Sequence, residues 1–392
     1  MSSSFTQMGL QLELFNAIND LKYDDPTPIQ EQAIPALLNG KNVLGQAQTG
    51  TGKTAAFALP MLQKIDPEAR CIQALVLAPT RELAIQVANA TRQLAGDSPV
   101  RILPIYGGQS YSIQKKQLHR GVDVVVGTPG RMLDLIQQGV LDLSKVNYVV
   151  LDEADIMLEM GFLEDVETIL SEVPEERQIA LFSATMPDRI RKLAERFMGE
   201  YKLVSVDQKQ MTTDLTDQIY FEVNQADKFE ALCRIIDIEP EFYGLVFLRT
   251  KVETEQVGNR LTDRGYHAEF LHGDISQAQR ERILNKFRKK RINILAATDV
   301  AARGLHIPAV SHVINYDVPY DSEAYVHRIG RTGRAGRSGD AILFVAPREK
   351  RMLSQIERAT RKKIERMELP STEDINDKRI NRFKQRITDT LA

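Results

Sequence analysis

Short apolar runs rich in β-branched residues alternate with longer amphipathic stretches along the first half of the chain. The apolar runs are "KNVLGQ" (41–46), "ALVLAP" (74–79), "VVVGTP" (124–129), "YVVLDEAD" (148–155) and "IALFSAT" (179–185). Helix-like segments such as residues 80–94 lie between them. Strands that alternate with helices in this way are typical of a parallel sheet with crossover helices.

The same rhythm restarts after a polar break. The later runs are "GLVFLRT" (244–250), "AEFLHG" (268–273), "INILAATD" (292–299), "HVINYD" (312–317) and "AILFVAP" (341–347). The pattern predicts two α/β domains, residues 1–206 and 218–370, with a linker at 207–217 and a basic helical extension at 371–392. No sequence repeat of fixed period relates the halves, so any kinship between them is one of architecture.

Composition fits a soluble globular protein and excludes a membrane span. The 392 residues are 43% hydrophobic and 27% charged, and no apolar run reaches the roughly 18 residues that a span needs. The start "MSSSFTQMGL" lacks the features of a signal peptide, and the only cysteines are Cys71 and Cys233. We therefore expect a cytoplasmic protein.

Charge is distributed unevenly. The net charge is −2, although residues 348–392 carry 13 Lys or Arg and 8 Asp or Glu. Such a surplus is most often a solvated helix face, and contact of the tail with nucleic acid is a second interpretation.

The run "HRIGRTGRAGRSG" (327–339) places an arginine and a glycine at every third position. A collagen-type repeat and a disordered basic tail are both excluded, because the run is short, lacks proline and lies between two predicted strands. It is interpreted as a loop or helix start inside a domain, with arginines directed at a ligand.

A phosphate-binding loop is predicted at "AQTGTGKT" (47–54), after the first strand. Ala47 stands where the pattern usually has glycine; Gln48, Thr49 and Thr51 complete the loop. Gly50 and Gly52 allow backbone N–H groups to surround phosphates, Lys53 reaches the β and γ phosphates, and the Thr54 hydroxyl can bind Mg²⁺. The alternative is a glycine-rich turn without a ligand.

Carboxylates that end the strand at 148–155 suggest a metal site. Asp152 is placed to bind the Mg²⁺ shell, and Glu153 to orient and deprotonate a water molecule. An acidic surface turn is the alternative. Together with the phosphate loop, the pair indicates nucleotide hydrolysis.

Ten motifs in order resemble DEAD-box RNA helicases, and bacterial members in particular. They are "PTPIQ" (26–30), "AQTGTGKT", "PTREL" (79–83), "GG" (107–108), "TPGR" (128–131), "DEAD" (152–155), "SAT" (183–185), "TD" (298–299), "ARG" (302–304) and "HRIGRTGR" (327–334). The resemblance covers about residues 5–347. It implies two RecA-like domains, ATP and Mg²⁺ as cofactors, and RNA-stimulated ATP hydrolysis. This hydrolysis would drive local, non-processive unwinding of short duplexes or remodelling of RNA–protein complexes.

The resemblance also implies nucleotide contacts. Tyr23 would stack on adenine, Gln30 would hydrogen-bond its edge, and Phe5 is the isolated upstream aromatic residue. ATP would lie in a cleft between the domains, where Arg331 and Arg334 match arginine fingers that offset charge on the γ-phosphate. The residues implied to link hydrolysis with RNA binding are His327, Arg328, Ser183, Thr185 and Asp155.

The implied RNA contacts fall in both domains: Arg81, Gly108, Thr128 and Arg131 in the first, and Thr250, Gly273 and Thr298 in the second. Such contacts to phosphate and sugar predict binding of single strands and short duplexes that is largely independent of sequence, weakens with salt and favours RNA over DNA. ATP and RNA would each favour a closed form. Ribosomal or RNA-decay proteins are candidate partners.

Three other functions use part of this motif set. An ATP-gated RNA clamp would hydrolyse slowly, which the intact Glu153, Arg331 and Arg334 disfavour. A DNA translocase is disfavoured by "PTPIQ" and "DEAD". A nucleotide kinase would not need the arginines of the second domain.

His306 departs from the resemblance, because the family pattern has an aspartate there that contacts the ATP ribose. Neutral imidazole can bond a hydroxyl but cannot present a carboxylate, so we expect weaker nucleotide coupling than is usual. A tolerated neutral substitution is the alternative. Steady-state ATP hydrolysis by the His306→Asp variant tests this: tighter coupling is expected, and unchanged KM and kcat would contradict the expectation.

Overall fold

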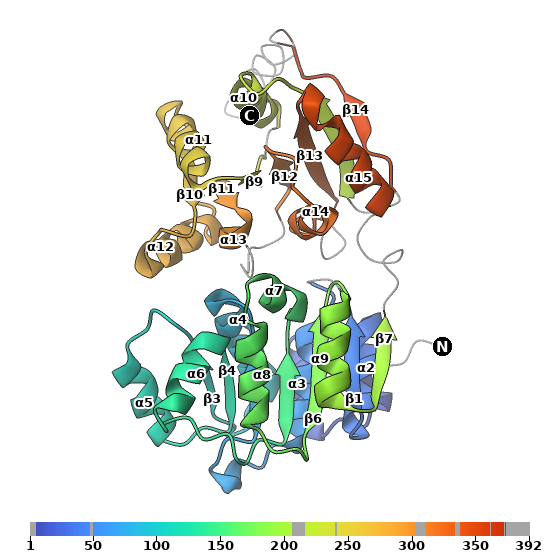
Figure 1. Ribbon diagram of the computed structural model, residues 1–392, viewed down its shortest axis with the longest axis vertical. Coiled ribbons are helices and arrows are strands. Elements are labelled where there is room, and N and C mark those ends of the chain that lie inside the picture. The colour runs from blue at the N-terminus through green and yellow to red at the C-terminus, as the bar shows by residue number, and fades with distance from the viewer. Residues whose placement is uncertain are drawn as a thin grey trace, which may run out of the picture. The chain divides into compact units, whose positions relative to one another are not determined.

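The computed structural model describes residues 5–47, 50–205, 216–239, 241–302, 310–333, 338–360, 362–371 and 373. These residues form two compact units, one made of residues 5–205 and the other of residues from 216 onward (Figure 1). Each unit is described by itself.

The first unit contains a parallel sheet of seven strands in the order β3-β4-β2-β5-β6-β1-β7. The strands are β1 (Asn42–Gln46), β2 (Ala74–Leu77), β3 (Ile102–Ile105), β4 (Val124–Gly127), β5 (Tyr148–Leu151), β6 (Gln178–Ser183) and β7 (Tyr201–Ser205). The inner strands β2, β4 and β5 are buried along their whole length. Their continuous apolar runs are therefore explained by helices on both faces.

Helices cover both faces of this sheet. They are α1 (Leu12–Asp20), α2 (Pro28–Leu38), α3 (Lys53–Lys64), α4 (Arg81–Ala95), α5 (Tyr111–His119), α6 (Pro129–Gln137), α7 (Ala154–Glu159), α8 (Leu163–Ser171) and α9 (Asp188–Met198), with short 3₁₀ turns at Phe5–Gln7 and Pro67–Ala69.

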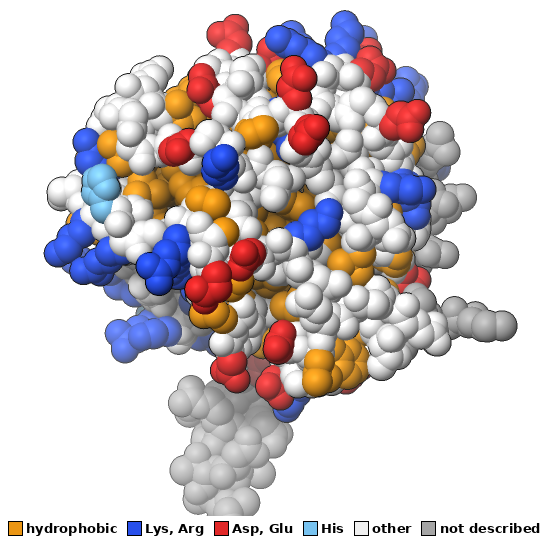
Figure 2. All heavy atoms as spheres, turned by 90° about the horizontal axis from the view of Figure 1, so that it is seen from below, with side chains coloured by type: hydrophobic (Ala, Val, Ile, Leu, Met, Phe, Trp, Pro, Cys, Tyr) orange, Lys and Arg blue, Asp and Glu red, His pale blue; other side chains and the backbone are white. Residues whose placement is uncertain are grey.

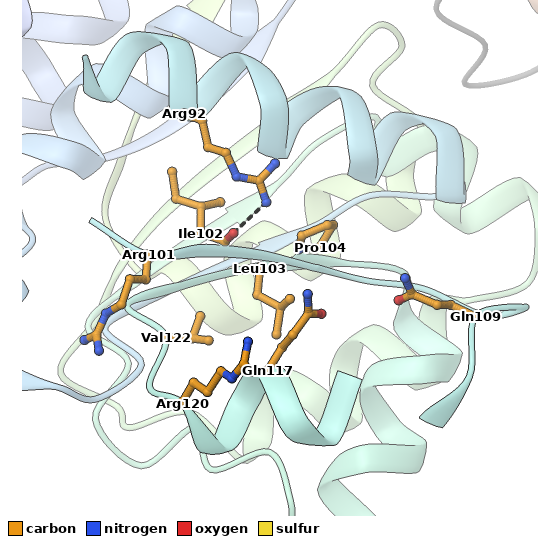
Figure 3. Close-up of a pocket in the computed structure, with 9 residues that line it drawn as sticks. All are labelled: Arg92, Arg101, Ile102, Leu103, Pro104, Gln109, Gln117, Arg120 and Val122. Atoms are coloured by element: carbon orange, nitrogen blue, oxygen red, sulfur yellow. Dashed lines mark hydrogen bonds between the residues drawn. The ribbon is translucent and has the colours of Figure 1, made fainter. Parts of the chain in front are cut away.

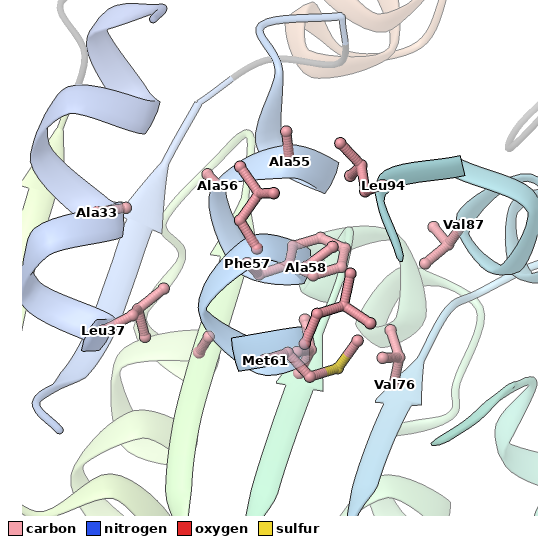
Figure 4. Close-up of a cluster of buried hydrophobic side chains, with 14 of the residues drawn as sticks. Ala33, Leu37, Ala55, Ala56, Phe57, Ala58, Met61, Val76, Val87 and Leu94 are labelled. Carbon is pink, nitrogen blue, oxygen red and sulfur yellow. The ribbon is translucent and has the colours of Figure 1, made fainter. Parts of the chain in front are cut away.

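Alternating strand residues supply two separate cores. On β5, Tyr148 and Val150 pack with α1 to α4, whereas Val149 and Leu151 pack with α6 to α9. Figure 4 shows α3 between α2 and α4, with Phe57 at the centre of the first core. The α3 helix, which begins at the predicted phosphate loop, is thus fixed against the sheet by its apolar side.

The second unit has the same strand order as the first, β10-β11-β9-β12-β13-β8-β14, and all its pairs are parallel. Its strands are β8 (Thr216–Glu222), β9 (Gly244–Leu248), β10 (Ala268–Leu271), β11 (Ile294–Thr298), β12 (His312–Asn315), β13 (Gly339–Val345) and β14 (Glu365–Met367). Its helices are α10 (Lys228–Ile238), α11 (Lys251–Asp263), α12 (Gln277–Arg288), α13 (Asp299–Ala302), α14 (Ser322–Ile329) and α15 (Lys350–Thr360), with a 3₁₀ turn at Pro347–Glu349. The predicted fold class, two mainly parallel sheets that are each flanked by helices, is confirmed.

Two local expectations can be compared with the structure. The arginine–glycine run, predicted as a loop or a helix start, begins in the last turn of α14 and continues through turns at residues 330–333, as a loop would; its residues 334–337 lie outside the described part. The first two residues of β8, Thr216 and Asp217, fall within the range predicted as linker. Most of the tail from 371 onward is also outside the described residues.

None of the helices in the described part of the chain combines the length and the apolar character needed to cross a membrane.

Gly127 allows a close approach between β4 and β3, and this provides a test of the fold. A Cβ atom there would lie 2.3 Å from the Ile105 carbonyl oxygen and 2.6 Å from Met132 Cε, whereas one at Gly130 meets nothing within 4 Å. We expect Gly127→Ala to lower the free energy of unfolding of the first unit by about 1–3 kcal/mol through overpacking. Gly130→Ala, inside a helix, should be neutral or stabilising by up to about 1 kcal/mol. Urea unfolding of both variants measures the difference; equal midpoints would contradict the expectation.

Candidate nucleotide and RNA site

Three predicted motifs follow three neighbouring strands of the first unit. The phosphate loop follows β1, residues 152–155 follow β5, and residues 183–185 end and follow β6. Since β6 pairs with both β1 and β5, the three motifs lie together at one edge of the sheet. This is the edge where parallel α/β sheets bind ligands.

The phosphate loop has the backbone that anion binding requires. Gly50 and Gly52 have φ values of 90° and 87°, in the left-handed region. Lys53 and Thr54 begin α3, whose N-cap residue Gly52 provides no side-chain hydrogen bond. The first N–H groups of α3 are thus available to a phosphate.

Other predicted residues of the loop differ in how much of them the structure shows. Ala47 is buried and donates its N–H to the Ser183 carbonyl at 3.0 Å. Thr51 is buried as well. Gln48 and Thr49 lie outside the described residues.

Gln30 connects the predicted adenine motif to this loop. Its Nε2 donates to the Gly52 carbonyl at 3.1 Å, and its Oε1 accepts from the Thr27 N–H at 2.8 Å. A Cβ at Gly52 would lie 2.4 Å from Gln30 Nε2, so Gly52 is required for space as well as for φ.

The two aromatic residues of the adenine prediction differ in exposure. Tyr23 is 40% exposed, which leaves its ring accessible to a base, whereas Phe5 is 3% exposed and packs in the core with Met8 and Leu14. The adenine contact of Phe5 stays a prediction.

Lys53 and Asp152 form a buried, incomplete ion pair. Lys53 Nζ lies 3.9 Å from Asp152 Oδ1, and neither atom has a hydrogen-bond partner within the described part of the chain. Burial raises the pKa of Asp152 to about 6; the nearby Glu153 also raises it and Lys53 lowers it. Buried polar atoms without partners are costly. A phosphate for Lys53 and a cation for Asp152 would satisfy both, so these residues fit ATP with Mg²⁺.

Glu153 and Asp155 have separate structural settings on the same turn. Glu153 is 6% exposed and has φ 52°, an unusual conformation for a residue other than glycine. Asp155 Oδ2 accepts hydrogen bonds from Ala184 N–H at 3.0 Å, Thr185 N–H at 2.8 Å and Thr185 Oγ1 at 3.0 Å. Asp155 N–H also donates to Ser183 Oγ at 3.3 Å. The structure thus brings together the predicted coupling residues of the first unit.

The predicted RNA contacts of the first unit follow its other three neighbouring strands, β3, β4 and β2. Gly108 has φ +87°, and a Cβ there would lie 2.4 Å from Arg81 Nη1, so the Arg81 guanidinium rests directly on Gly108. Thr128 is the N-cap residue of α6 and donates its N–H to the Ile105 carbonyl at 3.0 Å. The four residues therefore lie in the loops and first helical turns that follow three adjacent strands.

Arg131 is held by residues that the sequence analysis missed. Its Nη1 donates to the Gln109 carbonyl at 2.9 Å and to Gln114 Oε1 at 3.1 Å, and its guanidinium lies 3.8 Å from the centre of the Tyr111 ring. The glutamines lie just after the "GG" motif, which is the signal in the sequence that could have indicated them.

The predicted RNA contacts of the second unit also lie at the ends of three adjacent strands. Gly273, Thr298 and Thr250 follow or end the adjacent strands β10, β11 and β9. Lys251 and Asp274, which follow Thr250 and Gly273, form an ion pair at 2.6 Å. The three predicted RNA contacts therefore also share one part of the sheet edge.

Arg328 is fixed inside the second unit. Its guanidinium makes a bidentate ion pair with Asp299 at 2.6 and 2.7 Å and donates to Asn315 Oδ1 at 3.1 Å and to the Asp317 carbonyl at 2.8 Å. These bonds tie α14 to the ends of β11 and β12. Asp299 and Asn315 were not predicted, because such partners are far apart in sequence.

The remaining predicted residues of this segment vary in setting. Arg331 is 7% exposed, and His327 is partly buried in the last turn of α14. Arg334 and His306 lie outside the described residues.

Comparison with known proteins matches both units. Residues 27–193 match the DEAD/DEAH box helicase model, residues 227–336 the helicase conserved C-terminal domain, and residues 370–392 the RNA helicase DeaD dimerization domain. The chain is 52% identical over 372 residues to the DEAD-box ATP-dependent RNA helicase CshA of Geobacillus kaustophilus, covering 95% of this chain and 80% of that protein. It is also 52% identical over 392 residues to the ATP-dependent RNA helicase DeaD of Mycobacterium tuberculosis, covering 100% and 69%.

Solved structures agree. S. cerevisiae Dbp5 bound to RNA and ADP BeF3 has a TM-score of 0.86 and 34% identity, covering 96% of this chain and 98% of that one. Mss116p bound to ssRNA and AMP-PNP has a TM-score of 0.85 and 28% identity, covering 96% and 81%.

Asp155 offers a test of the geometry that does not depend on activity. In Asp155→Asn, one carboxylate oxygen is replaced by an NH₂ group and the negative charge is lost. An NH₂ group that faces Ala184 and Thr185 cannot accept their hydrogen bonds, and an amide oxygen in that place accepts them more weakly than a carboxylate does. We expect amide hydrogen exchange at Ala184 and Thr185 to become about tenfold faster, which corresponds to a loss of about 1.4 kcal/mol. Asp188→Asn, an exposed change in the same segment, is the control. Equal exchange in both variants would contradict the assigned contacts.

Proposed function

The chain belongs to the DEAD-box family of ATP-dependent RNA helicases, and we propose from its site how individual residues carry out ATP hydrolysis and RNA binding. As a member of this family it hydrolyses ATP and binds RNA. The observation that carries the residue roles is the buried pair Lys53–Asp152, whose facing atoms have no hydrogen-bond partner among the described residues.

ATP binds with its phosphates at the start of α3. Backbone N–H groups of the loop around Gly50 and Gly52 hold the β-phosphate, and Lys53 Nζ contacts the β and γ phosphates. Tyr23 stacks on adenine, and the Gln30 amide, next to Gly52, bonds the edge of the base. Gln30 therefore connects the adenine end of the nucleotide site with its phosphate end, because its amide also donates a hydrogen bond to the Gly52 carbonyl.

Asp152 and Thr54 would hold Mg²⁺ through the carboxylate and the hydroxyl oxygen, and the ion would neutralise charge on the phosphates. Because the pKa of Asp152 is raised to about 6, the ligand is charged above this pH and increasingly protonated below it. Metal binding should therefore weaken as the pH falls through 6.

Glu153 orients the attacking water and accepts its proton. Its buried carboxylate directly follows Asp152 in sequence. Glu153 has a left-handed backbone conformation and is the N-cap residue of α7. The Asp155 carboxylate, in contrast, already accepts hydrogen bonds from the segment 183–185. It therefore couples the position of that segment to the turn that carries Glu153.

The second unit supplies positive charge to the transferred phosphate. Arg331 and Arg334 offset the charge that develops on the γ-phosphate, and Arg328 positions them through its bonds to Asp299 and Asn315. His327, in the last turn of α14, contributes to the same role.

RNA binds along the loops that carry Arg81, Gly108, Thr128 and Arg131 and those that carry Thr250, Gly273 and Thr298. Contacts to phosphate and sugar make binding largely independent of sequence and sensitive to salt. Local strand separation follows when both units hold one strand. Residues 370–392, which match a dimerization domain, make a second copy of the chain a further proposed partner.

Glu153→Gln tests the assigned base. In the unaltered protein, single-stranded RNA should stimulate ATP hydrolysis in Mg²⁺ and single-stranded DNA should not. We expect Glu153→Gln to lower the RNA-stimulated kcat by about 100-fold or more, since positioned bases contribute 10²–10⁴, while ATP-dependent RNA binding persists.

Glu164→Gln, an exposed change on α8, is the matched control and should retain full activity. Full RNA-stimulated hydrolysis by Glu153→Gln would rule out the role as base. Tight ATP-dependent RNA binding with hydrolysis near background in the unaltered protein would favour a clamp.

A further inference from the structure

A concave pocket lies against β3, the edge strand of the first sheet, on the side away from β4 (Figure 3). Its volume is about 260 Å³. It is lined by Arg92, Arg101, Ile102, Leu103, Pro104, Gln109, Gln117, Arg120 and Val122. These residues come from α4, β3, α5 and the segments between α4 and β4, and apart from Gln109, whose carbonyl holds Arg131, none of them has a role in the function described above.

The unpaired edge of β3 cannot form a β-ladder with another strand. Pro104 has no N–H group to offer, and Arg92 Nη2 already donates to the Ile102 carbonyl at 2.6 Å, the bond drawn in Figure 3. A proline and a covered carbonyl remove the backbone groups that an added peptide strand would need. The pocket is therefore unsuited to a peptide that extends the sheet.

The surroundings of the pocket are strongly basic. Residues 92–120 contain five Lys or Arg and a single acid, Asp97, in a chain whose net charge is −2. Figure 2 shows Lys and Arg side chains gathered on the left of the first unit, the side on which Figure 1 draws α5. A basic concave surface attracts anions.

One arginine of the pocket is available to a ligand. Arg101 is neutralised by the buried Asp123 through bonds of 2.6 and 3.0 Å, and Arg92 is bonded to Ile102 and Asn89. The Arg120 guanidinium, in contrast, has no hydrogen bond or ion pair to any residue that the structure describes, and neither does the Gln117 side chain. A cation beside an amide is suited to a phosphate oxygen.

The pocket is continuous with the proposed RNA surface. Gln109 lines it, directly follows Gly108, and accepts a hydrogen bond from Arg131 through its carbonyl oxygen at 2.9 Å. The four residues of β3 span about 13 Å, which corresponds to about four nucleotides of a stacked strand. An RNA strand that leaves Gly108 can therefore reach Arg120 without leaving the protein surface.

We propose that this pocket is a phosphate-binding subsite, in which Arg120 and Gln117 hold a backbone phosphate of the RNA strand beyond Gly108 and Arg131. The proposal rests on the RNA-binding function proposed above and lengthens its footprint on the first unit. The occupant is an RNA backbone because the pocket adjoins the RNA contacts and favours an anion.

Binding of RNA of two lengths tests the proposal. Fluorescence anisotropy compares a short single strand, just sufficient to stimulate ATP hydrolysis, with strands longer by about eight nucleotides at either the 5′ or the 3′ end. We expect Arg120→Gln to weaken binding of one of the longer strands about fivefold near 0.1 M salt and to reduce the slope of log K against log salt by about 0.7, the effect of one phosphate contact.

The short strand distinguishes this defect from a general one. Its affinity and its stimulation of hydrolysis should be unchanged in Arg120→Gln, and Arg191→Gln, an exposed arginine on α9, should bind all strands like the unaltered protein. An equal loss on short and long strands, or no loss on either longer strand, would overturn the subsite. Absence of RNA binding by the unaltered protein would instead contradict the proposed function itself, and the subsite with it. Equal melting temperatures exclude a folding defect.

Discussion

A parallel sheet that is buried on both faces can present polar groups only where its strands end, and both units of this chain are built on such a sheet. The shared order β3-β4-β2-β5-β6-β1-β7 and its repeat in the second unit decide which strand ends are neighbours. In the first unit, β5, β6 and β1 carry the phosphate motifs, while β3, β4 and β2 carry the RNA motifs. The two groups meet where β2 pairs with β5, and there the Asp152 N–H donates to the Leu77 carbonyl at 2.9 Å. The proposed nucleotide and RNA contacts are thus joined by one backbone pairing.

Buried charged side chains at these strand ends are of two kinds. Those with several hydrogen-bond partners stabilise loops, and those without partners are suited to bind a ligand. Asp155 and Arg328 are each 2% exposed and have several hydrogen-bond partners, so each fixes a loop. Lys53 and Asp152 are also buried, at 5% and 3% exposed, yet Lys53 Nζ and Asp152 Oδ1 lack partners within the described residues. A buried ion pair that is left incomplete destabilises the protein until a ligand completes it. The unsatisfied pair therefore marks the place where binding energy is gained.

The sequence predicted nine of the ten inner strands, and it missed three of the four edge strands. Inner strands such as β2 and β5 are buried on both faces, so their residues form continuous apolar runs. The strands that were not predicted, β3, β7, β8 and β14, lie at or next to sheet edges; β7 and β8 include exposed residues, and β14 is exposed along its whole length. Supporting side chains were missed for a different reason. Gln114 and Asn315 contact arginines of separate motifs, 17 and 13 residues away, and although the "GG" motif points to the neighbourhood of Gln114, the pairing itself is set by the folded sheet.

The edge strand β3 shows how one requirement of folding can create a binding surface. An exposed edge must be protected against pairing with other chains, and here Pro104 and Arg92 provide that protection. Covering the Ile102 carbonyl needs a long cationic donor, and anchoring the start of the strand uses another, Arg101, paired with Asp123. Arg101 is neutralised by Asp123, but Arg92 bonds only the neutral Ile102 carbonyl and Asn89, so its charge adds to the positive potential beside Arg120. Because β3 ends at the "GG" motif, this protected edge leads directly to the surface where Arg81 and Arg131 lie.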